Sequence, residues 1–267
     1  MKMLARVLVG IFATIMVLGV FTSEASAKKR KPKPSPTPTP AVILAASPQT
    51  AINLADWKLT LPIGSVESPT EIKQPALNTY QIDPWFVANS GGGVRFRAAV
   101  NGVTTSGSGY PRSELREMTD NGSTKASWSS TSGTHTMFID QAITSLPKTK
   151  QHVVAGQIHD SLDDVIVIRL ESSKLYINVD GKNIYTLDSN YTLGKRFTVK
   201  FVVSGGKTSI YYNNSADPSY ILDKSYSGGY FKAGVYTQSN CTKEVSGLCS
   251  DSNFGEVVIY QLNVTHG

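Results

Sequence analysis

The sequence predicts an all-β domain built as a sandwich or barrel. Short runs rich in β-branched and aromatic residues recur along the chain. Turns containing glycine and asparagine separate these runs. No window repeats apolar residues at the 3.6-residue spacing of a helix over a helical length. Many short strands joined by tight turns are typical of sandwiches and barrels.

The strands are predicted in chain order from these runs. An Asp-Gly pair at residues 180–181 and a Ser-Gly-Gly run at residues 204–206 indicate two tight hairpins. Short helices fit only at residues 77–82 and 147–151. The predicted strands cover residues 111–118, 153–160, 164–171, 174–180, 182–188, 196–203, 207–213, 230–238 and 254–265.

Three segments follow one another along the chain. Residues 1–27 are typical of a secretory signal peptide, because Lys2 and Arg6 precede an apolar run that ends before an Ala-Ser-Ala cleavage site. Residues 28–41 form a basic linker whose alternating prolines favour an extended chain. Residues 42–267 are expected to fold as one β domain. We therefore expect a secreted, extracellular protein without a membrane span in its mature form.

The basic charge of the chain belongs to its N-terminal part. The whole chain has 26 Lys and Arg against 20 Asp and Glu. Seven of the basic residues and one of the acidic residues lie within the first 41 positions. The remaining domain is neutral, which argues against a nucleic acid as its partner.

The two cysteines, Cys241 and Cys249, are expected to form a disulfide in an oxidising compartment. The loop between them is short, so the disulfide should contribute at the lower end of about 2–4 kcal/mol. No histidine lies close to them in the sequence, which argues against a metal site.

Two of the predicted strands each offer a face of polar side chains. Side chains two residues apart in a strand point the same way. In residues 230–238, Phe231, Ala233 and Val235 should therefore point toward a core. The polar faces consist of Arg112, Glu114 and Arg116 in one strand and Tyr230, Lys232, Gly234, Tyr236 and Gln238 in the other.

The stretch VVAGQIHD at residues 153–160 is predicted to be a third such strand. Alternation places Val153, Ala155, Gln157 and His159 on one face. Taken singly, a strand histidine is more often structural than catalytic, and an Arg-x-Glu-x-Arg run is more often a solvated ladder of ion pairs. Together the three faces supply arginine, lysine, amide, imidazole and phenol groups, which suit a surface that binds a polyanion and transfers protons.

Four motifs carry a resemblance to a known family. RSELRE at residues 112–117, QIH at 157–159 and YFKAGVYTQ at 230–238 resemble, in this order, the signature segments of the alginate lyases of polysaccharide lyase family 7. ADWKLTLPIG at 55–64 resembles the opening strand of that family. The resemblance implies a β-jelly roll sandwich whose concave sheet binds alginate, an anionic polysaccharide.

The resemblance implies β-elimination at a uronic acid. The C5 proton is removed, the 4-linked sugar leaves, and a C4=C5 double bond forms. The family assigns carboxylate neutralisation to the positions of Arg112 and Gln157. His159 suits the base, and Tyr236 suits the acid, with its pKa lowered by nearby cations such as Arg112 or Lys232. This chemistry calls for no metal and no other cofactor.

The other polar side chains are expected to bind substrate or support the site. Lys232 matches a family position that contacts substrate. Ile158 points the opposite way from its neighbours, and isoleucine at this position goes, in the family, with a preference for guluronate, whereas valine goes with mannuronate. We expect a monomer. The expected substrate-binding residues are Glu114, Arg116, Tyr230, Lys232 and Gln238.

Three alternatives stay open at this point. A lectin-type binding module would share the sandwich but would not need His159 and Tyr236 beside Arg112. A jelly-roll glycoside hydrolase needs two carboxylates that flank the cleaved bond, whereas Glu114 and Glu117 differ in parity and should face opposite sides of the strand. A lyase that acts on another polyuronate, such as polyglucuronate, would use the same groups.

Overall fold

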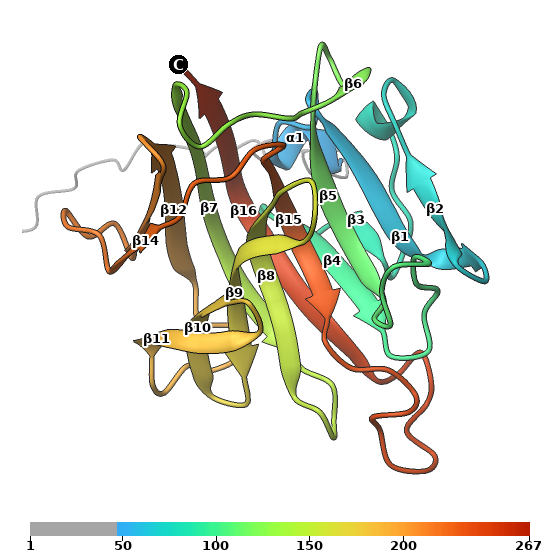
Figure 1. The fold of residues 1–267 in the computed structure, drawn as a ribbon. Coiled ribbons are helices and arrows are strands. Elements are labelled where there is room, and N and C mark those ends of the chain that lie inside the picture. The colour runs from blue at the N-terminus through green and yellow to red at the C-terminus, as the bar shows by residue number, and fades with distance from the viewer. Residues whose placement is uncertain (1–46) are drawn as a thin grey trace, which may run out of the picture. The chain divides into compact units, whose positions relative to one another are not determined.

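A computed structural model of the chain describes residues 47–267, so the predicted signal and linker lie outside the described residues. Two antiparallel β-sheets make up this part of the chain (Figure 1), which confirms the all-β prediction. The strands of the first sheet, in spatial order, are β11 (Lys182–Asp188), β10 (Lys174–Val179), β9 (Asp164–Glu171), β8 (His152–His159), β15 (Tyr230–Thr237), β5 (Arg112–Thr119), β1 (Trp57–Ser65) and β2 (Ser68–Ile72), with β6 (Thr124–Lys125) paired to β5.

The second sheet packs against the first across the core. Its strands, in spatial order, are β14 (Tyr220–Asp223), β13 (Lys207–Tyr212), β12 (Phe197–Ser204), β7 (Thr134–Ser145), β16 (Phe254–His266), β4 (Val94–Ala99) and β3 (Phe86–Ala88). The helical segments are α1 (Pro48–Ala51) and a 3-10 turn at Ala76–Asn78, whereas residues 147–151 form a loop. Among residues 47–267, no helix has the length and apolar character needed to cross a membrane.

Both predicted hairpin turns are present. Asp180 and Gly181 connect β10 to β11 with φ angles of 49° and 75°, a left-handed pair that suits a two-residue hairpin loop. Gly205 and Gly206 connect β12 to β13 in the same way, with φ angles of 58° and 77°. The turn residues set the register next to each turn. β12 and β13 keep it along their length, whereas β10 and β11 shift register twice farther from the turn.

The core lies between the sheets and confirms the alternation predicted for β15. Phe231, Ala233 and Val235 of this strand are fully buried in the core. From the second sheet, Ile139 of β7 and Phe201 of β12 join the same cluster. Burial of these side chains fixes which face of β15 points away from the core. We call that side of the first sheet its outer face.

The alternation predicted for β8 is wrong in its first half. Val153 and Ala155 belong to the core, together with Ile158. Gln157 and His159 lie on the outer face, opposite two outer-face residues of β15. The parity of side chains therefore changes between Ala155 and Gln157, and the four residues predicted to share a face do not.

Gly156 is the cause of this change in parity. The register with both neighbouring strands is irregular between Val154 and Gln157, as in a β-bulge. Gly156 has a φ of 99°, a conformation that favours glycine. A Cβ atom at this position would lie 2.8 Å from Cδ1 of Ile139. Glycine is thus required both by the backbone and by the close approach of the second sheet.

Replacing Gly156 tests this requirement. We expect Gly156→Ala to lower the free energy of unfolding by about 2–4 kcal/mol, since it adds both backbone strain and a core clash. Gly181→Ala is the control, because Gly181 also has a positive φ but no atom within 4 Å of a new Cβ, and should cost about 1 kcal/mol. Equal losses in urea denaturation would contradict a role for the contact with Ile139.

Candidate active site

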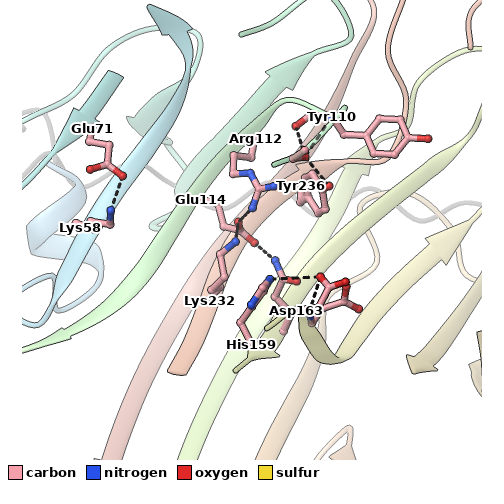
Figure 2. Close-up of polar contacts among 12 residues, drawn as sticks. Lys58, Glu71, Tyr110, Arg112, Glu114, His159, Asp163, Lys232 and Tyr236 are labelled. Atoms are coloured by element: carbon pink, nitrogen blue, oxygen red, sulfur yellow. Dashed lines mark hydrogen bonds and ion pairs between the residues drawn. The ribbon is translucent and has the colours of Figure 1, made fainter. Parts of the chain in front are cut away.

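Three adjacent strands, β8, β15 and β5, bring the predicted polar side chains together on the outer face (Figure 2). The register of the strands decides which residues become neighbours. Lys232 of β15 lies between Arg116 of β5 and Gln157 of β8. Tyr236 pairs with Arg112, and Tyr230 pairs with His159. Residues from three distant parts of the sequence thus form one cluster.

Glu114 is the centre of this cluster. Its side chain is 1% exposed. Its carboxylate accepts hydrogen bonds from Lys232 Nζ at 2.6 Å, Arg112 Nη1 at 3.1 Å and Gln157 Nε2 at 2.5 Å. Figure 2 shows Arg112 of the same strand and Lys232 of the neighbouring strand directed toward the carboxylate. Glu114, predicted among the substrate-binding residues, holds three of the other predicted site residues in place.

The ion pair between Glu114 and Lys232 persists at neutral pH. Burial alone would raise the pKa of Glu114, but Lys232 and Arg112 outweigh burial and hold this pKa below its usual range. Burial lowers the pKa of Lys232 to about 8, against the opposing effect of Glu114. The carboxylate is therefore ionised at pH 7 and most of the lysine is protonated.

His159 lies at the edge of the cluster with its side chain 22% exposed. Its ring stacks on Tyr230, with 5.3 Å between centroids and 19° between planes. Its Nδ1 is 3.4 Å from the carbonyl oxygen of Asp160. Burial and the charge of Lys232 both lower the pKa of His159 below its ordinary value of 6.5. The imidazole is therefore neutral at pH 7 and able to accept a proton.

Tyr236 is packed beneath a cation. Cζ of Arg112 lies 4.0 Å from the centroid of its ring, and its hydroxyl is 2.8 Å from Oγ of Ser108. The expected net lowering of its pKa is not found. Arg112 does lower the pKa of Tyr236, but burial has the larger effect and raises it above 10.0. At pH 7 Tyr236 is therefore a neutral phenol that can donate a proton.

Arg116, Tyr230 and Gln238 lie around this centre. Cζ of Arg116 is 4.0 Å above the ring of Tyr230, and its Nη2 donates to the carbonyl of Ala126 at 3.0 Å. The ring of Tyr230 is thus held between the guanidinium of Arg116 and the imidazole of His159. Gln238 lies one residue beyond the end of β15, where its backbone N–H donates to the carbonyl of His152. Within residues 47–267, the side chain of Gln238 makes no hydrogen bond with the cluster.

Two residues near the cluster were missed by sequence reasoning. Lys58 of β1 lies opposite Arg116 and forms an ion pair with Glu71. The alternation of Lys58 with the core residues on either side of it was a usable signal for its outward position. Ser108 comes from the loop between β4 and β5. No periodicity applies to a loop, so nothing in the sequence pattern indicated that Ser108 would reach Tyr236.

The two glutamates of β5 face opposite sides, as their parity predicted. Glu117 is buried, and its carboxylate accepts from Trp128 Nε1 at 3.1 Å and from the backbone N–H of Phe231 at 2.8 Å. A ring nitrogen of His266 lies 2.6 Å from its other oxygen. Because Glu114 and Glu117 do not face each other, they do not provide the carboxylate pair of a glycoside hydrolase.

The predicted disulfide between Cys241 and Cys249 is present, with 4.8 Å between the Cα atoms. Glu244, inside the loop that it closes, accepts from the backbone N–H groups of Thr149 and Lys150 at 2.9 and 3.2 Å. Burial acts against ionisation of Glu244, but its hydrogen bonds prevail and lower its pKa to about 2. The disulfide loop, which follows the strand of Tyr236, is thereby fastened to the loop before β8.

Comparisons with known proteins agree with this geometry. Residues 52–266 match a family profile described as alginate lyase. The chain is 54% identical to an alginate lyase from Corynebacterium sp., with a TM-score of 0.80 over 84% of this chain and 99% of that one. It is 53% identical to AlgAT5, an alginate lyase of polysaccharide lyase family 7, with a TM-score of 0.78 over 84% of this chain and all of that one (100%). An alginate lyase from Klebsiella pneumoniae is 24% identical over 83% of this chain and 92% of its own length.

Replacing Glu114 tests whether it organises the site. We expect Glu114→Gln to lower the free energy of unfolding at pH 7 by about 3–5 kcal/mol, because it leaves buried cations without their partner. Glu71→Gln is the matched control, since Glu71 also pairs with a lysine but its side chain is 36% exposed. It should cost less than about 1 kcal/mol.

The difference between wild type and Glu114→Gln should also depend on pH. The folded-state pKa of Glu114 lies below the ordinary value of 4.5. The stabilisation is therefore fully present above pH 4.5 and is lost as the pH falls through the folded pKa. Urea denaturation at several pH values measures this difference. A difference that stays constant down to strongly acidic pH would show that the charge of Glu114 is not what stabilises the cluster.

Proposed function

This chain belongs to the alginate lyases of polysaccharide lyase family 7, and from that premise we propose how its outer-face cluster cleaves alginate. The reaction is β-elimination at a uronic acid. The C5–H and C4–O bonds break, a C4=C5 double bond forms, the C5 proton passes to a base and the leaving oxygen receives a proton from an acid. One observation carries the proposal. Three adjacent strands bring together two cations, a neutral imidazole and a neutral phenol, which belong to Arg112, Lys232, His159 and Tyr236.

Arg112 and Gln157 neutralise the uronate carboxylate in this proposal. Loss of the C5 proton moves negative charge toward that carboxylate, so donors aimed at it stabilise the transition state. Arg112 directs one of its donors to Glu114 and has further N–H groups available. Gln157 directs one amide hydrogen to Glu114 and retains a second. Lys232 adds positive charge beside both residues and is proposed to contact the substrate.

His159 is the proposed base and Tyr236 the proposed acid. The pKa of His159 is lowered, so the imidazole is neutral and can take the C5 proton at pH 7. The pKa of Tyr236 is raised, so the phenol keeps a proton for the leaving oxygen. Burial acts on both groups in the direction that their roles require. Glu114, Arg116, Tyr230 and Gln238 are proposed to support these groups or to bind the chain of sugars.

We further propose a preference for guluronate. In guluronate the C5 proton and the leaving oxygen lie on opposite faces, so base and acid must be different residues. A neutral His159 and a protonated Tyr236 match that requirement. In mannuronate the two lie on the same face, and Tyr236 would have to serve as both. Initial rates on purified guluronate, mannuronate and glucuronate polymers test the preference, and a faster rate on mannuronate or glucuronate would overturn it.

The enzyme is proposed to act outside the cell as a single chain. The disulfide between Cys241 and Cys249 fits an oxidising compartment, and the signal-like residues 1–27 support export. All proposed catalytic groups come from one chain. Intact mass and light scattering of protein from culture medium test both points. Protein that remains inside the cells, or activity that appears only in an oligomer, would contradict them.

The roles of His159 and Tyr236 make distinct predictions. His159→Ala should lose on the order of 10²–10⁴-fold in kcat on guluronate blocks and less on mannuronate blocks. Tyr236→Phe should be severely impaired on both. His152→Ala is the control, because His152 lies on the same strand but pairs with Glu171 away from the cluster. The assay is the ultraviolet absorbance of the unsaturated ends. Equal losses from His159→Ala on the two polymers would rule out the split of roles.

The pH profile on guluronate blocks should report the pKa of His159. The base must be neutral, so activity is lost as the pH falls through this pKa. Because burial and Lys232 lower it, the acid limb should have its midpoint below pH 6.5. The measurement is kcat/KM against pH, which reports the free enzyme. A midpoint clearly above 6.5 would be inconsistent with His159 as the base.

A further inference from the structure

The hydroxyl of Tyr236 has one hydrogen-bond partner among residues 47–267, the side chain of Ser108. Ser108 lies in the loop between β4 and β5, where its backbone N–H donates to the carbonyl of Thr105 at 3.0 Å. Its Oγ is 2.8 Å from the phenolic oxygen. A loop residue outside every polar strand face thus touches the group proposed to transfer a proton.

The other contacts of Ser108 leave its hydroxyl free to donate to Tyr236. A serine hydroxyl has one proton and two lone pairs. One lone pair accepts the backbone N–H of Tyr110 at 3.2 Å. The proton can go to the carbonyl of Tyr110 at 3.3 Å or to the oxygen of Tyr236 at 2.8 Å. The contact with Tyr236 is of ordinary length for an O–H to oxygen bond with either hydroxyl as the donor, and the contact with the Tyr110 carbonyl is long and weak. Little is therefore lost when Ser108 turns its proton to Tyr236.

Donation from Ser108 has two consequences for the phenol. While Tyr236 is protonated, its own proton is not shared with Ser108 and can point toward the leaving oxygen of a bound sugar. After that proton has been given up, the phenolate needs a donor, and Ser108 is already in place. A hydrogen bond to a charged oxygen is stronger than one to a neutral oxygen, so the contact favours the product of proton transfer over the starting state.

We propose that Ser108 is a positioning residue for Tyr236, directing its proton to the leaving group and stabilising the phenolate that forms. The inference rests on the proposed role of Tyr236. Arg112 stacked on the ring acts in the same direction through its charge. The hydroxyl of Ser108 adds a directional bond at the oxygen itself, which the cation above the ring does not supply.

Ser108→Ala removes the donor, and Ser108→Thr keeps a hydroxyl. We expect Ser108→Ala to lower kcat roughly 10- to 100-fold, the range for a hydrogen bond to a charged group, with a smaller change in KM. The loss should be larger on mannuronate blocks, where Tyr236 would have to be ionised before it removes the C5 proton. Ser108→Thr should recover most of the rate. Ser106→Ala, an exposed position in the same loop, should behave as wild type.

The alkaline limb of the pH profile distinguishes two reasons why Ser108→Ala could lose activity. Loss of the hydrogen bond to Tyr236 would move this limb, whereas a change in loop packing would not. Activity that requires a protonated Tyr236 is lost as the pH rises through its pKa. Without the donor the phenolate is less stable, so this pKa rises and the limb of Ser108→Ala should move to higher pH. A wild-type kcat and an unmoved limb in Ser108→Ala would overturn the inference. Equal impairment of Ser108→Thr and Ser108→Ala with an unmoved limb would also overturn it.

A double variant keeps this test distinct from that of the proposed function. Adding Ser108→Ala to Tyr236→Phe should cause no further loss in kcat, because the oxygen on which Ser108 acts is gone. If Tyr236→Phe is inactive while Ser108→Ala is unaffected, only the inference about Ser108 fails. If Tyr236→Phe retains full activity, the proposed acid itself is wrong and the inference fails with it.

Discussion

The buried carboxylate of Glu114 is the constraint on which the whole site depends. A charge with 1% exposure is tolerated only when its lone pairs are filled. Glu114 meets this condition with Lys232 from β15, Gln157 from β8 and Arg112 from its own strand. The three strands are thus locked in register at the point where the substrate carboxylate is proposed to bind. Glu114 carries one negative charge against the two positive charges of Lys232 and Arg112. The cluster therefore keeps a net positive charge, which favours binding of the negatively charged uronate.

Burial then sets the protonation states around this centre. It penalises the charged form of any group, so it makes an imidazole less basic and a phenol less acidic. His159 is partly buried beside Lys232, and Tyr236 is partly buried beside Arg112. The positive charges reinforce burial at the imidazole and oppose it at the phenol, where burial prevails. A single environment therefore prepares one group to accept a proton and the other to donate one.

Periodicity predicted the all-β class and the polar faces of β5 and β15, the resemblance supplied the jelly roll and the roles of the site residues, and periodicity failed where the backbone is irregular. The alternation in β5 and β15 placed Glu114 and Tyr236 correctly because these strands are paired in regular register. The same rule misplaced Val153, because a glycine with a positive φ interrupts β8, and φ cannot be obtained from alternation. The contact between Ser108 and Tyr236 could not be predicted for a related reason, since side chains in a loop do not alternate at a fixed spacing. The direction of the Tyr236 pKa depended on burial, which only the packed structure provides.

The central claim is that this cluster breaks alginate by elimination and not by addition of water. Mass spectrometry of the oligosaccharides released from purified polyguluronate tests it most directly. Elimination predicts that each cleavage yields one new non-reducing end that lacks the elements of water and carries the C4=C5 double bond. The wild-type protein should produce only such ends. Fragments whose new ends have gained a full water molecule would show hydrolysis and would contradict the account.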